Sequence, residues 1–89
     1  MTSQEFTLDH IRVILRQSAG EPEHLPLDGE IAEYTFEEIG YDSLARLEAC
    51  GRIEREYGVS LDAELLRGTS TPAELIAAVN GQLVERVAS

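Results

Sequence analysis

The pairing of helical apolar spacing with helix-ending glycines most constrains what this chain can fold into. Four segments carry apolar residues at helical spacing, and a glycine follows each of the first three. A capping box formed by Thr71 and Glu74, with Pro72 at the first helical position, opens the last segment. No strand-like alternation of apolar and polar residues competes with this pattern. The sequence therefore predicts an all-α fold with helices at about residues 7–19, 43–57, 62–67 and 72–84.

The chain is short enough for one domain only. Its 89 residues can enclose a single modest core, so we expect one domain over residues 1–89, a small four-helix bundle with three main helices and one short helix. The connection over residues 20–42 is long for a compact domain, and such loops are either functional or internally anchored. Its apolar residues favour anchoring, and we expect a short helical turn at about residues 29–34.

The charge of the chain is strongly negative. Seventeen acidic residues stand against seven basic ones, all of them arginine, for a net charge of −10. Ten of the acidic residues and three of the arginines lie between residues 30 and 64. Nucleic acid and anionic membrane surfaces would be repelled and are poor partners. A protein with a basic docking patch is the favoured partner, and its attraction would weaken with salt.

The single cysteine, Cys50, excludes an internal disulfide and a cysteine-based zinc cage. It falls on the apolar face of the helix expected over residues 43–57, where inert packing is its expected role. The first residues lack the basic start and apolar run of a signal peptide, and no stretch approaches membrane-spanning length. We therefore expect a soluble, cytoplasmic monomer.

Ser43 is the candidate functional residue, because it stands where a loop turns into an amphipathic helix. A helix start offers free backbone N–H groups and the positive end of the helix dipole, which suit a serine that carries a phosphate ester. The simpler alternative is that Ser43 only caps the helix. Asp42 can supply that cap, which leaves the hydroxyl of Ser43 available for covalent modification.

Catalytic and metal sites are not expected. A serine nucleophile needs a base within reach, and neither His10 nor His24 has a spacing that argues for Ser43. The glycine that follows the serine of a nucleophile elbow is also missing. The run Asp28-Gly29-Glu30 lacks the ligand spacing of a calcium loop, and the histidines have no partners at metal-ligand spacing. Both histidines are expected at the surface or in helix caps.

Two leucines near the start of the same helix form a second apolar stripe beside the core-facing one. Leu44 and Leu47 are interleaved with acidic residues, as in a partner patch with an apolar centre and a charged rim. We expect Leu44 to be exposed. For Leu47 the sequence leaves two readings open, exposure on such a patch or burial at the end of the core.

The run Gly40-Tyr41-Asp42-Ser43-Leu44 resembles the attachment motif of acyl carrier proteins, in which the serine after aspartate receives 4′-phosphopantetheine from coenzyme A. Residues 36–48, 55–60, 71–76 and 79–81 extend the likeness to the carriers of bacterial aromatic (type II) polyketide synthases. The resemblance implies an acyl-carrier-like bundle and a non-catalytic carrier in polyketide biosynthesis of the antibiotic type. Ser43 would hold malonyl units and the growing poly-β-ketone as thioesters on the covalent arm.

The resemblance also implies partners that dock in turn. They are a phosphopantetheinyl transferase using coenzyme A, a malonyl acyltransferase, a ketosynthase–chain length factor pair, and tailoring ketoreductase and cyclases. The positions that such partners would read are Asp42, Leu44, Leu47, Glu48 and Glu54. Alternatives within the class are a fatty-acyl carrier and an aminoacyl or peptidyl carrier. From a different class, the alternative is an acidic helical adaptor that is never modified.

Two polar residues beside the expected core carry open alternatives. Arg46 is expected to keep its stem on the core and its head in water. A sharper hypothesis places its guanidinium at a cleft mouth, where it donates hydrogen bonds to ketone oxygens of the chain or to the arm. Asn80 would act in the same way, or else cap the last helix before Gly81.

Overall fold

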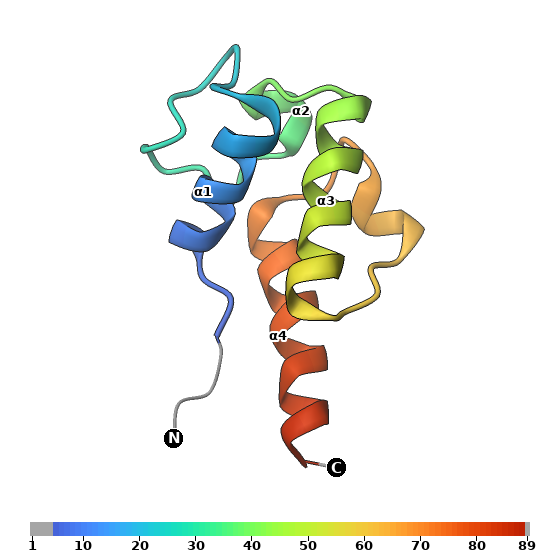
Figure 1. The fold of residues 1–89 in the computed structure, drawn as a ribbon. Coiled ribbons are helices and arrows are strands. Elements are labelled where there is room, and N and C mark those ends of the chain that lie inside the picture. Colours follow the sequence, from blue (N-terminus) through green and yellow to red (C-terminus); the bar gives the residue numbers. More distant parts are fainter. Residues whose placement is uncertain (1–4, 89) are drawn as a thin grey trace.

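The structure is a computed structural model that describes residues 5–88, with side chains described up to residue 84. Its helical elements in chain order are α1 (Leu8–Ala19), α2 (Phe36–Ile39), α3 (Ser43–Tyr57), the short 3₁₀ helix η1 (Ala63–Leu66) and α4 (Pro72–Ala88). The long helices α1, α3 and α4 form the bundle, and α2 and η1 belong to the connections between them (Figure 1). No strand occurs in this described part of the chain, which confirms the predicted all-α fold.

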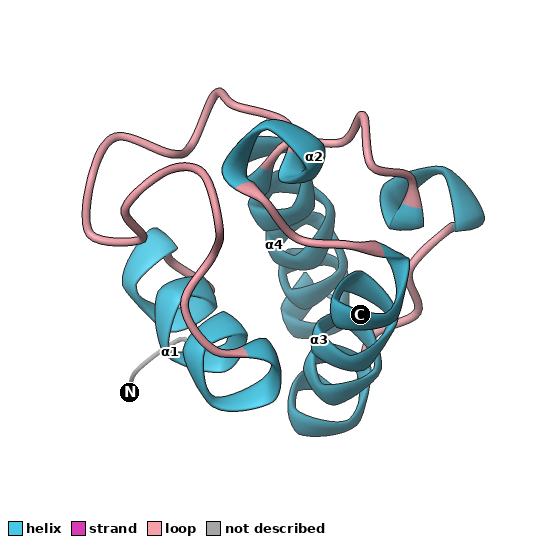
Figure 2. Ribbon diagram, turned by 90° about the horizontal axis from the view of Figure 1, so that it is seen from above, coloured by secondary structure: helices cyan, strands magenta, loops and turns pink. Residues whose placement is uncertain are grey.

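The core is aliphatic and draws on the three long helices and on the first connection. Helix α1 packs most extensively against α3, and the view along the bundle in Figure 2 shows α1, α3 and α4 arranged around the centre. The least exposed apolar side chains are Phe6, Ile11, Leu15, Leu27, Ile31, Ile39, Ile53, Leu75 and Val79. Burying one such side chain stabilises the fold by about 1.5–3 kcal/mol. Leu27, Ile31 and Ile39 therefore anchor the long first connection.

Polar contacts anchor the same connection to α1. The guanidinium of Arg12 donates from Nε to the carbonyl of Leu27 and from Nη2 to that of Gly29, both at 3.0 Å. The hydroxyl of Tyr41 donates to the carbonyl of Gly20 at 2.9 Å. The connection is thus held internally at both its middle and its end, as its apolar content indicated.

The short helix of this connection lies later than we expected. Residues 29–34 form turns without a helix, and α2 begins at Phe36. The reason is a capping box: Thr35 accepts from the backbone N–H of Glu38, and the Glu38 carboxylate accepts from that of Thr35. Such a box starts a helix locally, and its Thr-x-x-Glu spacing was present in the sequence.

The third and last helices also differ from expectation. The segment expected over 62–67 is a short 3₁₀ helix limited to Ala63–Leu66, and Asp62 gives it no side-chain cap. Helix α4 continues through Gly81 to Ala88, beyond the expected end at residue 84. The alternative in which Asn80 caps this helix is therefore wrong.

None of the described helices combines the length and apolar character needed to cross a membrane.

Gly40 allows the two ends of the first connection to touch. Its φ is +114°, and a Cβ built there would lie 2.6 Å from the backbone nitrogen of Glu23 and 2.7 Å from that of His24. The N–H groups of His24 and Leu25 both donate to the carbonyl of Ile39, at 3.0 and 3.1 Å. This backbone contact is possible only because residue 40 has no side chain.

Replacing Gly40 by alanine should lower the free energy of unfolding by about 3 kcal/mol or more, because a left-handed backbone and a backbone clash add together. Gly20→Ala is the matched control, since Gly20 also has a positive φ, +81°, but open space around its Cβ. Its expected loss is about 1–2 kcal/mol. Chemical denaturation measures both losses, and equal values would show that the close approach at Gly40 contributes nothing.

Candidate functional site

Ser43 is the first residue of α3, and its neighbour Asp42 caps the helix. Asp42 has an extended backbone (φ −84°, ψ −178°), and its Oδ1 accepts from the N–H of Ala45 at 2.9 Å. Ser43 itself is exposed, and its hydroxyl makes no hydrogen bond with another described residue. The capping task therefore belongs to Asp42, and the Ser43 hydroxyl is free at the positive end of the α3 dipole.

The residues before Ser43 hold it in place. The N–H groups of Gly40 and Tyr41 both donate to the carbonyl of Phe36, at 3.0 Å each, which ends α2 in a tight turn. The ring of Tyr41 is buried, and burial raises its pKa to about 12. The phenol is therefore neutral at ordinary pH and keeps its hydrogen bond to Gly20. Ser43 thus emerges from an anchored segment rather than from a loose loop.

An open hollow of about 410 Å³ adjoins the serine. It is lined by Glu23, His24, Glu37, Gly40, Tyr41, Asp42, Ser43 and Arg46. His24 was not anticipated here, because it reaches the site through the backbone contact of residues 23–25 with Ile39. Glu37, which was not anticipated either, lines the hollow from α2. His24 makes no hydrogen bond to Ser43, nor does any described residue orient its ring. The hollow thus lacks the base and orienting partner of a serine nucleophile.

Arg46 faces this hollow but is not solvated in the way we expected. Its Nε donates to the carbonyl of Leu66 at 2.9 Å and its Nη1 to that of Tyr41 at 3.1 Å. The interpretation with the charged head in water is wrong, since the guanidinium links the start of α3 to η1. It remains half-buried at the edge of the hollow that contains Ser43.

The expected docking residues lie mainly on the outward face of α3. Leu44 is 64% exposed and Leu47 is 54% exposed, which settles the question left open for Leu47 in favour of exposure. Asp42 and Glu48 are exposed as well. Glu54 differs, because its Oε2 accepts from the N–H of Leu61 at 2.8 Å and holds the connection after α3.

Asn80 binds the N-terminal segment instead of facing the hollow. Its Oδ1 accepts from the N–H of Phe6 at 2.8 Å, and its Nδ2 donates to the carbonyl of Phe6 at 2.9 Å. A contact between Asn80 and a bound chain would have to break this pair of bonds. Figure 1 shows the blue segment before α1 and the start of α3 at opposite ends of the bundle. The structure therefore gives Asn80 an anchoring role.

Comparison with known proteins identifies the family. The profile of the phosphopantetheine attachment site matches residues 11–79. The granaticin polyketide synthase acyl carrier protein of Streptomyces violaceoruber is 48% identical over 80 residues, 90% of this chain and 94% of that protein. The oxytetracycline polyketide synthase acyl carrier protein of Streptomyces rimosus is 43% identical, over 88% of this chain and 82% of that protein.

The chain belongs to the acyl carrier proteins of type II polyketide synthases. Solved structures agree with this assignment. The 3,7-dioxo-octyl actinorhodin acyl carrier protein from Streptomyces coelicolor aligns with a TM-score of 0.81 at 40% identity, covering 96% of this chain and 99% of that one. The chain is therefore a non-catalytic carrier that tethers acyl intermediates of polyketide biosynthesis on covalent 4′-phosphopantetheine.

The remaining reactive side chains of this carrier have structural positions. Cys50 is buried, and burial raises the pKa of its thiol to about 11, which keeps it protonated and inert as expected. His10 completes a capping box with Thr7 at the start of α1. Within the described part of the carrier, no group of three or more His, Cys, Asp or Glu residues is placed to hold a metal ion.

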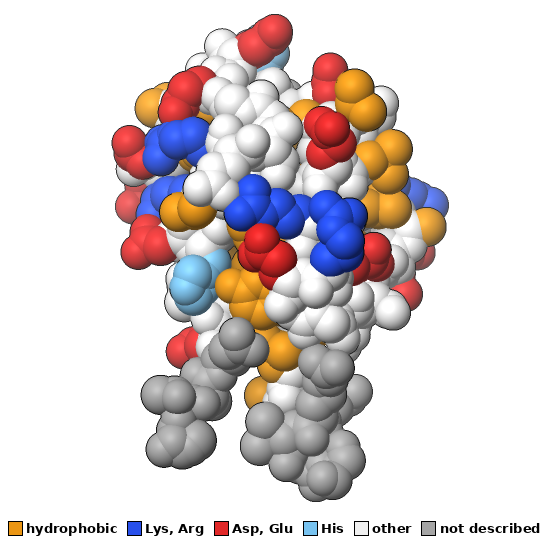
Figure 3. Space-filling model, viewed as in Figure 1, with side chains coloured by type: hydrophobic (Ala, Val, Ile, Leu, Met, Phe, Trp, Pro, Cys, Tyr) orange, Lys and Arg blue, Asp and Glu red, His pale blue; other side chains and the backbone are white. Residues whose placement is uncertain are grey.

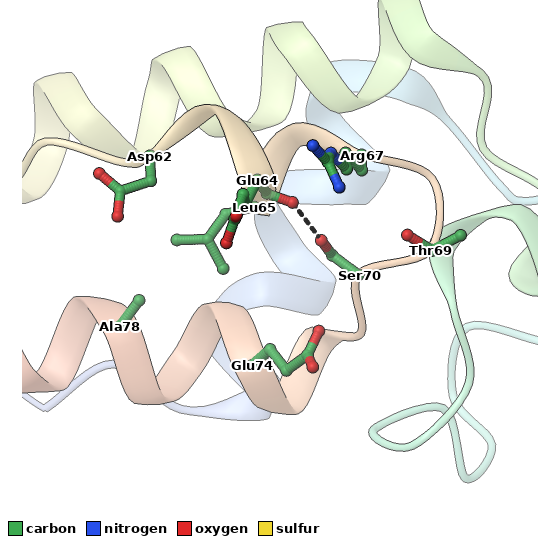
Figure 4. Close-up of a pocket in the computed structure, with 8 residues that line it drawn as sticks. All are labelled: Asp62, Glu64, Leu65, Arg67, Thr69, Ser70, Glu74 and Ala78. Carbon is green, nitrogen blue, oxygen red and sulfur yellow. Dashed lines mark hydrogen bonds between the residues drawn. The ribbon is translucent and has the colours of Figure 1, made fainter.

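A hollow of about 500 Å³, larger than the one beside Ser43, lies between η1 and α4 (Figure 4). Its walls bear three carboxylates, those of Asp62, Glu64 and Glu74, together with Arg67. The buried Ser70 hydroxyl closes one side by donating to the carbonyl of Glu64 at 2.8 Å. Such a polar lining suits water better than an acyl chain, so size alone does not mark the functional site.

Replacing Asp42 by alanine should lower the free energy of unfolding by about 1 kcal/mol, because the start of α3 loses its cap. Asp62→Ala is the control: Asp62 precedes η1 in the same way but caps no N–H, so its effect should stay within about 0.5 kcal/mol. Denaturant unfolding of both variants measures the difference. Equal effects of the two substitutions would contradict a capping role for Asp42.

Proposed function

We propose that Ser43 is the residue of this carrier that bears the 4′-phosphopantetheine arm. The observation that carries the proposal is an exposed, unbonded hydroxyl at the first position of α3, beside an aspartate that already caps the helix. The other described serines offer less, since Ser18 is half-buried and Ser70 is buried and hydrogen-bonded. Ser60 is exposed but lies at no helix start.

Attachment at this position matches the electrostatics of the helix start. The serine oxygen displaces the nucleotide part of coenzyme A from the pantetheine-bearing phosphorus, and the serine proton leaves. No described side chain accepts that proton, so the transferase supplies the base. The phosphodiester formed then lies near the α3 N-terminus, an attraction of about 0.3–1 kcal/mol at an exposed site. The arm leaves from a fixed point, and its thiol holds malonyl units and the growing poly-β-ketone.

The outward face of α3 next to Ser43 is the proposed docking surface for the enzymes of the synthase. Leu44 and Leu47 form its apolar centre, and Asp42 and Glu48 supply negative charge at its rim. The partners that fit are the phosphopantetheinyl transferase, the malonyl acyltransferase, the ketosynthase–chain length factor pair, and tailoring ketoreductase and cyclases. Glu54 contributes less, since one of its oxygens is bound to Leu61. The carrier would act as a monomer in the cytoplasm, where coenzyme A is available.

Arg46 is the side chain proposed to contact the arm or the chain. It follows Ser43 by three residues, so both lie on one side of the helix, and both line the same hollow. Two backbone carbonyls hold its Nε and Nη1, which fixes the guanidinium and leaves further N–H groups to donate. The ketone oxygens of the poly-β-ketone chain would accept hydrogen bonds from these remaining N–H groups of Arg46.

Incubation with coenzyme A, Mg²⁺ and a promiscuous transferase should raise the intact mass of the wild-type chain by one phosphopantetheine group. Ser43→Ala should show no increase, and Ser60→Ala, which removes another exposed hydroxyl, should load as the wild type does. Loading of Ser43→Ala would place the arm elsewhere. No loading of the wild type would favour the unmodified adaptor, and selective charging of the loaded form with aminoacyl rather than malonyl groups would favour a peptidyl carrier.

Replacing Arg46 by leucine should reduce the changes in NMR chemical shift that a polyketide mimic causes around residues 41–46 when it is loaded on the arm. The comparison is between loaded and unloaded forms of each variant, so the loss of the bonds to Leu66 and Tyr41 affects both equally. Arg67→Leu, which removes an exposed arginine that lines a different hollow, is the control. Unchanged chain-induced shifts in Arg46→Leu would rule the contact out.

A further inference from the structure

A second hollow on α3 shares Leu47 and Glu48 with the docking surface described above and extends that surface away from Ser43. It has a volume of about 320 Å³ and is lined by Ser18, Leu47, Glu48, Gly51, Arg52 and Arg55. Gly51 is in the interior of the continuous helix α3. The glycines with positive φ among the described residues are Gly20, Gly40 and Gly58, so Gly51 adopts a backbone conformation open to any residue.

Nothing in the described part of the chain requires glycine at residue 51. A glycine inside an exposed helix makes that helix less stable than an alanine at the same position would. A Cβ added to Gly51 would meet only the Nη1 of Arg55, at 3.5 Å, an ordinary van der Waals contact. Neither conformation nor internal packing therefore explains the glycine. What the missing side chain provides is room on the outer surface of α3.

The walls of the hollow specify what can enter it. Leu47, 54% exposed, offers apolar surface. Arg55 is exposed and makes no hydrogen bond or ion pair with any other residue that the structure describes. Arg52, by contrast, is already paired with Glu56 at 2.7 Å. The hollow thus combines a backbone floor without a side chain at Gly51, an apolar wall, the Glu48 carboxylate, and a cation next to Gly51 that forms no ion pair with a described residue.

The hollow continues the docking surface along one line of the helix. Leu44, Gly51 and Arg55 are separated by seven and four residues, which places them on the same side of α3. In Figure 3, exposed hydrophobic side chains gather over the upper part of α3, and arginine lies below them. Arg55 lies about 16 Å along the axis from Leu44, at ~1.5 Å per residue. The sign of the charge changes over this distance, from Asp42 and Glu48 to Arg55.

We propose that the hollow over Gly51 receives an apolar side chain of the ketosynthase–chain length factor pair, and that a carboxylate of the same enzyme binds Arg55. The inference rests on the proposed docking role of α3 and adds the chemistry of the partner surface. That surface presents basic groups toward Asp42 and Glu48 and an acidic group toward Arg55. A uniformly basic surface would set like charges opposite Arg55, which disfavours it. The change of sign also fixes the direction in which α3 lies on the enzyme.

The test uses the complete phosphopantetheinylated chain and the ketosynthase–chain length factor pair of its own synthase. Gly51→Ala should raise the melting temperature by about 4–8 °C, because an exposed helix gains an alanine. It should nevertheless weaken binding about tenfold or more, because the methyl group occupies the space of the entering side chain. Gly81→Ala is the matched control, since Gly81 lies inside α4 with open space around it. It should raise the melting temperature without changing the affinity.

Charge reversal tests the second part of the proposal. Arg55→Glu should weaken binding about tenfold or more. Arg67→Glu changes the net charge by the same amount on another face and should leave the affinity within about twofold. Unchanged affinity in Gly51→Ala would overturn the hollow as a contact, and unchanged or tighter binding by Arg55→Glu would overturn the acidic partner group. Mass spectrometry of the loaded wild type checks Ser43 separately, so a failure of attachment is distinguished from a failure of this contact.

Discussion

The backbone contact between residues 23–25 and the Ile39–Gly40 turn is the constraint on which the position of Ser43 depends. Two N–H groups from the early part of the first connection share the carbonyl of Ile39. The left-handed backbone of Gly40 lets residues 23–25 and 39–40 approach each other closely. The turn that follows directs Tyr41 into the core. With Tyr41 held, Asp42 is extended and in place to cap α3. Ser43 is therefore presented by packing rather than by a flexible loop.

At the start of α3, Asp42 supplies the helix cap and the neighbouring Ser43 does not. Asp42 satisfies a backbone donor of the first turn, so the hydroxyl of Ser43 has no structural obligation. A covalent group can then be attached without removing a cap. Arg46 adds rigidity from the next turn, since it ties α3 to the carbonyls of Leu66 and Tyr41. Ser43, the proposed attachment point, is thereby fixed while its hydroxyl stays free.

Helix α3 turns one face to the core and leaves the other, the proposed docking surface, exposed. Ala49, Cys50 and Ile53 are buried against the other helices, whereas Leu44 and Leu47 are largely exposed. Contiguous exposed apolar surface is typical of interaction sites, so the two neighbouring leucines beside Ser43 fit the proposed docking surface. The acidic rim near Ser43 and the arginine at the far end give this surface a direction that apolar contact alone would lack.

Local signals in the amino-acid order were enough to anticipate much of this molecule. Helical spacing and glycine stops predicted the all-α fold, the Asp-Ser pair predicted a capping aspartate beside a free serine, and Cys50 was expected in the core. The Thr35 capping box is equally local, although the apolar residues of the first connection favoured a turn at residues 29–34 instead.

The side-chain partners were beyond such signals. Arg46 binds a carbonyl 20 residues away and Asn80 binds Phe6, 74 residues away. His24 reaches the hollow of Ser43 through a backbone contact across the first connection. Helix caps and periodicity act between residues a few positions apart, and can be read along the chain. Which carbonyl an arginine or an asparagine binds depends on how the helices and loops pack, because many exposed and half-buried acceptors compete until the bundle has formed.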